Sequence, residues 1–299
     1  MNELITFYDL VNDQSTPPPS IIGDRVLLDK TILMLLGEPK AQKSFLALNI
    51  TIAMASGNNF AGFNFERPCK VLHLSAEGGY FPTRERIQKM AQEEQENILK
   101  NIFFPKYINL SIDNDDDYQN LRSLVEESKA DVLVLDPLIR FHSQDENSST
   151  AMNVVFRRFR ELINDFKISI VIVHHTGKNP SLGGRGSSLM RGEYDSCITI
   201  KKCDNHNKLS FDMRHVESPA PRKVKFNPET FWFECTDEDD KVAVYISEFG
   251  PVSKSELVNS WTSSNTYQSS HAYRLIDKAE KRGKVVLKND GKYHLVEEE

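Results

Sequence analysis

The chain of 299 residues has an ordinary globular composition, with 39% hydrophobic and 27% charged side chains, which excludes a disordered or coiled-coil protein. It has no stretch of the roughly 18 apolar residues needed to cross a bilayer and no signal-peptide pattern at its start, so we expect a cytoplasmic protein without a membrane partner. The formal net charge of −6 excludes a protein that coats duplex DNA by bulk charge, and four cysteines without a CxxC pair exclude a zinc finger.

Residues 1–30 are polar and contain three consecutive prolines, which predicts an N-terminal arm. Between 31 and 235, short apolar runs alternate with longer helical patterns. The runs are almost wholly apolar, as is typical of strands buried on both faces of a parallel sheet. The predicted strands are 31–36, 70–75, 131–136, 168–173 and 196–201, and the predicted helices between them are 43–56, 83–100, 117–128 and 150–166. This alternation predicts an α/β domain over 31–235 with a mostly parallel sheet flanked by helices.

A phosphate-binding loop is predicted where the first strand meets the first helix, in the run GEPKAQKS. The amides at the helix N-terminus and Lys43 are expected to bind phosphate oxygens of ATP, and the Ser44 hydroxyl is expected to bind Mg²⁺. Gln42 replaces the usual glycine before the lysine, so we expect its backbone to avoid the conformations that only glycine prefers and its side chain to point away from the nucleotide. The predicted nucleotide-binding residues are Gly37, Glu38, Pro39, Lys40, Ala41, Gln42, Lys43, Ser44 and Phe45.

Three further strand ends carry polar residues that ATP hydrolysis can use. Asp136 ends one strand and is expected to hold Mg²⁺ through water. Glu77 follows another and can polarise the attacking water, while His175 follows a third and can contact the γ-phosphate. Each residue alone also fits a structural role, as a helix cap, a solvated loop carboxylate or a core histidine. It is their combination with the phosphate-binding loop that favours ATP hydrolysis.

The C-terminal part of the chain has a different pattern. Residues 236–240 are acidic and predict a linker, and 241–299 read as three helices followed by two short strands around an Asn-Asp-Gly turn. This order is typical of a winged-helix domain. Residues 241–296 hold nine basic and five acidic side chains, a modest excess that fits either DNA or a replication protein as the partner.

The motifs over about 20–235 resemble the RepA-type hexameric helicases of broad-host-range plasmids, and the wider group of RecA-like ATPases in phages and mobile elements. The motifs are the phosphate loop, SAEGG, LDPLIRFH, HHTGK and RGSS, in that order. The resemblance implies a RecA-like core that assembles as a homo-oligomeric ring, expected to be a hexamer, with ATP between neighbouring subunits. It matches Lys43 and Ser44 to the phosphate loop, Glu77 to the catalytic carboxylate, Asp136 to the second acidic motif and His175 to the strand-end sensor.

The resemblance also implies an arginine that enters the ATP site of the adjacent subunit. Related helicases carry a Lys-x-Arg pair in their closing strands, where this chain reads Asp-Met-Arg, so Arg214 is the expected finger and is counted with the catalytic residues. Arg185 is the rival, and a surface salt bridge is the alternative for either. Single-stranded DNA is the expected partner of channel loops 178–192, where Lys178 and Arg191 lie among glycines and serines.

We therefore expect an ATP-dependent DNA helicase or translocase that acts as a ring in plasmid, phage or mobile-element replication. The alternative is a RecA-like ATPase that serves as a loader, recombination mediator or regulator without unwinding DNA. A third reading, an ATP-binding scaffold without turnover, gains from Gln42 and loses from the retention of Lys43, Glu77 and Asp136. The response of ATP hydrolysis to single-stranded DNA distinguishes these functions.

Overall fold

The computed structural model describes residues 4–92, 94–146, 148–175, 192–235, 240–263 and 269–296. The chain divides into two compact units, one formed by 1–200 with 211–219 and the other by 201–210 with 220–299. The second unit thus begins before the predicted linker at 236–240, because it includes strands that precede it.

A nine-stranded sheet runs through the described part of the chain, in the order β3-β2-β4-β5-β1-β6-β7-β8-β9. The pairs β2-β3, β2-β4, β4-β5, β1-β5 and β1-β6 are parallel, whereas β7-β8 and β8-β9 are antiparallel. The strands are β1 (Ile32–Gly37), β2 (Val71–Ser75), β3 (Ile102–Phe103), β4 (Val132–Asp136), β5 (Ser169–His175), β6 (Ser196–Lys202), β7 (Asn207–Met213), β8 (Arg222–Phe226) and β9 (Phe233–Cys235). The five apolar runs predicted as strands are confirmed as β1, β2, β4, β5 and β6.

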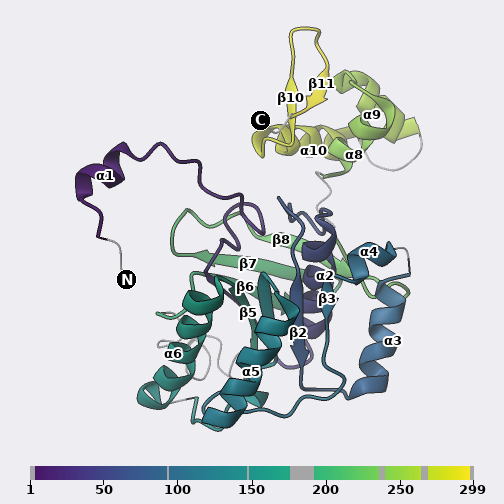
Figure 1. Cartoon of the computed structure of the whole chain (residues 1–299). Coiled ribbons are helices and arrows are strands. Elements are labelled where there is room, and N and C mark those ends of the chain that lie inside the picture. The colour runs from purple at the N-terminus through teal and green to yellow at the C-terminus, as the bar shows by residue number, and fades with distance from the viewer. Residues whose placement is uncertain are drawn as a thin grey trace. The chain divides into compact units, whose positions relative to one another are not determined.

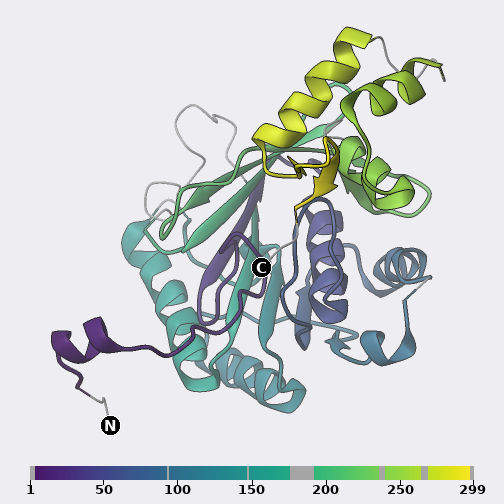
Figure 2. The ribbon, with the colours of Figure 1, turned by 90° about the horizontal axis from the view of Figure 1, so that it is seen from above.

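Helices cover both faces of the parallel part of the sheet (Figures 1 and 2). The helices before 200 are α1 (Phe7–Asn12), α2 (Lys43–Ser56), α3 (Tyr80–Met90), α4 (Glu96–Leu99), α5 (Asp115–Ser128) and α6 (Ser149–Phe166), with a short 3₁₀ turn η1 (Leu138–Arg140). Every second strand residue, such as Ile32 and Met34 in β1, packs with α5 and α6 in one buried cluster. Helix α2 contacts the same strands from the other face, and most of its side chains are buried. This confirms the predicted α/β fold with a mostly parallel sheet flanked by helices.

Two expectations about local structure were wrong. The predicted helix over 83–100 is two helices, because residues 92–95 are all Gln or Glu and offer no apolar face to pack. The second half of the predicted N-terminal arm belongs to the packed unit, since Ile22 and Leu27 form a β-bridge and are fully buried. Helix α1 has no buried residue.

The second unit contains a small helical module with its own core. Its elements are α8 (Asp240–Phe249), α9 (Lys254–Ser263), α10 (Ser269–Lys281), β10 (Val285–Leu287) and β11 (Tyr293–Leu295). Side chains from all three helices and both strands meet in one cluster around Leu257, Trp261 and Ile276. The predicted three helices and hairpin are therefore present, while their assignment as a winged helix stays a prediction. None of the helices in the described ranges is long and apolar enough to cross a membrane.

Candidate ATP-binding site

The predicted phosphate loop connects β1 to α2 at the carboxyl edge of the sheet. A Cβ atom added at Gly37 would lie 2.7 Å from the carbonyl oxygen of Ile200 in β6, so glycine is needed there for close packing. Gln42, the last residue before α2, has φ 65° and ψ 25°, which is the left-handed conformation that glycine prefers. The expectation that this backbone avoids such conformations was therefore wrong. Helix α2 begins here even without glycine, so the loop holds strain at Gln42.

Because left-handed backbone costs about 1–2 kcal/mol for a residue with a Cβ, we expect Gln42→Gly to stabilise the folded protein. The larger unfolded-state entropy of glycine offsets about 0.5–1 kcal/mol of this gain. The expected net effect is a melting temperature raised by about 2 °C, whereas Gln42→Val, with a β-branched side chain, should lower it. Thermal melts of both variants beside the wild type test this, and a glycine variant that melts below the wild type contradicts it.

Lys43 is held at the mouth of the loop by three acceptors. Its ammonium donates to the carbonyl oxygens of Gly37 at 2.8 Å and Glu38 at 2.9 Å, and lies 2.9 Å from His175 Nδ1 at the end of β5. Burial lowers the pKa of Lys43 to about 8, although Asp136 and Glu77 favour its charged form. Burial, followed by the charge of Lys43, also lowers the pKa of His175, so this histidine is neutral and accepts at Nδ1. Lys43 and His175 are thus directly connected.

Ser44 and Asp136 form a pair of oxygen ligands beside the lysine. The Ser44 hydroxyl donates to Asp136 Oδ1 at 3.1 Å, from the first turn of α2 to the end of β4. Asp136 is only 3% exposed, and burial raises its pKa to about 6. Carboxylate and hydroxyl oxygens suit Mg²⁺, which keeps several waters and needs few protein ligands. Within the described ranges, no group of three His, Cys, Asp or Glu side chains could hold a metal on its own, which fits such a site shared with phosphate oxygens.

Glu77 lies in the loop between β2 and α3, opposite the lysine. Its Oε1 accepts from Arg140 Nε at 3.1 Å, so η1 orients the carboxylate. Gly78 and Gly79 follow with φ 85° and 70°, backbone that other residues rarely adopt. The carboxylate is therefore presented from a loop whose turn depends on two glycines.

These residues surround one pocket of about 440 Å³ at the carboxyl ends of β2, β4 and β5. From the predicted set it is lined by Lys40, Gln42, Lys43, Ser44, Phe45, Glu77, Asp136 and His175. Gly37 and Glu38 contribute the carbonyls that hold Lys43, while Pro39 and Ala41 belong to the loop without lining the pocket. Open α/β sheets bind their ligands at this edge.

Arg86 is a pocket residue that sequence reasoning missed. It lines the pocket from α3, and its guanidinium lies 5.0 Å from the centre of the Phe45 ring. Its charge favours ionisation of Asp136, so it adds positive potential where phosphates are expected. Thr83, three residues earlier on the same helix, lines the pocket as well. The only signal in the sequence was this helical spacing after Glu77.

The histidine pair at the end of β5 points to opposite sides of the sheet. His175 lines the pocket, whereas His174 is buried with His142 and Glu146 in a separate polar cluster. Glu146 Oε1 lies 3.5 Å from His174 Nδ1 and 3.7 Å from His142 Nε2. The choice of His175 over His174 as the residue facing the phosphates agrees with this geometry.

Arg214 does not lie in this pocket. Its Nη2 donates to the carbonyl oxygen of Gly192 at 2.7 Å, and its Nη1 lies 3.8 Å from Asp195 Oδ1. Within one chain it therefore makes the kind of salt bridge considered as the alternative, and a role at a neighbouring subunit stays a proposal. The other basic candidates, Lys178, Arg185 and Arg191, lie outside the described residues.

Comparison with known proteins agrees with the pocket. Residues 4–181 match the family model of the AAA domain, so the chain belongs to the AAA domain family. Among solved structures it is similar to the ATPase domain of a helicase, with a TM-score of 0.53 and 11% sequence identity, over 69% of this chain and 85% of that chain. At this identity the likeness concerns the fold, which is consistent with the predicted RecA-like core. The assignment to RepA-type helicases stays a prediction.

Proposed function

We propose that this protein is an ATP-dependent DNA helicase or translocase that acts as a ring in the replication of a plasmid, phage or mobile element. The observation that carries the proposal is the convergence of Lys43, Ser44, Glu77 and Asp136 around one pocket in an AAA domain. Phosphoryl transfer is catalysed almost entirely by positioning and charge stabilisation, and these four side chains supply both.

The geometry gives each side chain a step. Lys43 and the amides at the start of α2 bind the β- and γ-phosphates, and Glu77 accepts the proton of the attacking water. Ser44 and Asp136 would hold Mg²⁺, which supplies neutralisation of the phosphate charge when bound. His175, 2.9 Å from the Lys43 ammonium, changes its partner when the lysine turns to a phosphate. The end of β5 thereby senses the γ-phosphate, next to the loops that are proposed to bind DNA.

The first test is steady-state ATP hydrolysis with and without single-stranded DNA, followed by unwinding of a forked duplex. Stimulation by DNA together with strand separation supports a helicase. Stimulation without separation supports a translocase. Hydrolysis that does not respond to DNA contradicts the proposal and favours the loader or regulator function, with a replication protein rather than DNA at 241–296.

Arg214 and the ring can be tested together by mixing inactive subunits. We expect Arg214→Ala to lower kcat by about 10³-fold or more, because an arginine finger stabilises charge on the γ-phosphate. Lys43→Ala should be inactive for a different reason, since it removes the phosphate ligand.

If Arg214 acts in the site of a neighbour, mixing the two variants creates some interfaces with both Lys43 and Arg214 intact, and hydrolysis partly returns. A mixture as inactive as its components contradicts a finger in trans. Each variant mixed with wild type serves as the control for subunit exchange.

A further inference from the structure

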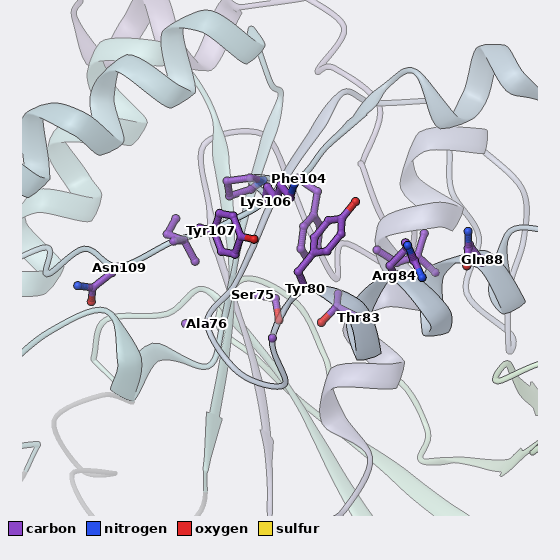
Figure 3. Close-up of a pocket in the computed structure, with 14 residues that line it drawn as sticks. Ser75, Ala76, Tyr80, Thr83, Arg84, Gln88, Phe104, Lys106, Tyr107 and Asn109 are labelled. Carbon is purple, nitrogen blue, oxygen red and sulfur yellow. The ribbon is translucent and has the colours of Figure 1, made fainter.

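A second pocket lies beside the ATP-binding site, between α3 and the segment 104–109 that follows β3. It has a volume of about 660 Å³ and is larger than the phosphate pocket, with which it shares Ser75 and Thr83. Figure 3 shows Tyr80 and Tyr107 at its centre, with Asn109 on one side and Arg84 and Gln88 on the other. Nothing in the proposed ATP chemistry uses this pocket.

Its walls combine aromatic rings with cations. The centres of the Tyr80 and Tyr107 rings lie 6.4 Å apart, and the Lys106 ammonium lies 5.2 Å from the first and 5.7 Å from the second. Tyr107 is 77% exposed, an unusual exposure for a large aromatic side chain that packs against another. Arg84 adds a second cation, and none of the described residues that line the pocket is acidic.

The aromatic and cationic surface continues along α3 beyond the pocket. Phe81 is 60% exposed, and the Arg84 guanidinium lies 5.0 Å from the centre of its ring. Ring faces separated by cations thus recur along one stretch of surface, from Phe81 to Tyr107. A ligand that fits this surface alternates flat apolar groups with negative charges.

Single-stranded DNA has this chemistry, since its bases stack on aromatic faces while its phosphates pair with Lys and Arg. An apolar peptide would leave the cations unpaired, and an acidic peptide would leave the exposed rings unused. We propose that the pocket between α3 and 104–109 binds single-stranded DNA, with Tyr107 as the stacking platform and Lys106 as a phosphate ligand. This site is distinct from the channel loops 178–192 and requires DNA binding alone, not unwinding.

The position of the site also connects DNA with ATP hydrolysis. Tyr80 is the first residue of α3 and follows the two glycines that carry the Glu77 loop. A strand bound at Tyr80 therefore contacts the loop that presents the catalytic carboxylate.

The experiment measures binding of the full-length protein to a fluorescent oligothymidylate, longer than the about 4–16 nucleotides of a typical single-strand site, over a range of salt concentrations. We expect Tyr107→Ala to raise the Kd about tenfold without changing its salt dependence, and Tyr107→Phe to bind as the wild type does. Lys106→Gln should make the slope of log K against log salt less steep by about 0.7, the value for one phosphate of a single strand. Tyr8→Ala is the matched control, because Tyr8 is 76% exposed on α1, and should bind normally.

An unchanged Kd for Tyr107→Ala together with an unchanged salt slope for Lys106→Gln overturns the proposal. So does a result in which these variants weaken ATP binding but not DNA binding, because the pocket then belongs to the nucleotide base. Weaker DNA binding with normal melting temperature and normal ATP affinity supports it. This outcome can be reached even if the wild type fails to unwind a fork, so the site and the helicase proposal are tested separately.

Discussion

Glu77→Gln is expected to lower the kcat of ATP hydrolysis by about 10²–10⁴-fold, the range for loss of a general base. Glutamine has the same shape and keeps an oxygen that can accept from Arg140 Nε, so the loop between β2 and α3 stays in place. It cannot take a proton from water. ATP affinity should change little, because the phosphates are bound by Lys43 and the start of α2.

Steady-state hydrolysis and binding of a fluorescent ATP analogue separate these two effects. Glu85→Gln is the matched control, since Glu85 is an exposed glutamate on the adjacent helix α3, and it should leave kcat unchanged. If Glu77→Gln hydrolyses ATP at the wild-type rate, Glu77 is not the base. A loss of ATP binding equal to the loss of kcat would instead show that Glu77 serves the shape of the pocket.

The parts of the fold that could be predicted from the sequence are those set by local patterns. The strands β4 and β5 are apolar at nearly every position because both their faces are covered, and such runs are legible in one sequence. The phosphate loop was legible for a similar reason, since strand, loop and helix follow each other within a few residues of Lys43. Polar residues at the ends of parallel strands then had to meet at one edge of the sheet.

The parts that could not be predicted depend on contacts between distant segments. Arg86 enters the pocket only because α3 turns back over the phosphate loop, and no motif marks it. The left-handed backbone at Gln42 is imposed by the helix that follows, against the preference of the residue itself. Arg214 poses a different problem, because the proposed partner of this side chain is another copy of the chain.

Asp136 provides the second prediction with a large expected effect, in which stability and activity change in opposite directions. Below pH 3.8 its carboxyl is protonated in both the folded and the unfolded chain. As the pH rises, the unfolded chain ionises first, and the folded state loses stability until the pH passes its own pKa of about 6. A rise from 3.8 to about 6 corresponds to about 3 kcal/mol. At neutral pH the wild type therefore carries a buried charge that destabilises it.

Asp136→Asn removes this charge and keeps the shape, so we expect the variant to melt about 6–12 °C above the wild type at pH 7 in buffer without Mg²⁺. The difference should shrink between pH 6 and pH 4, while Asp204→Asn, at an exposed position between β6 and β7, should show no such trend. ATP hydrolysis by Asp136→Asn should fall sharply, because a neutral amide is a poor ligand for Mg²⁺. A variant that melts below the wild type at pH 7 would show that the attraction between Asp136 and Lys43 outweighs the burial of the carboxylate. In that case the pair would stabilise the folded site, and its charge would be kept for stability as well as for the metal.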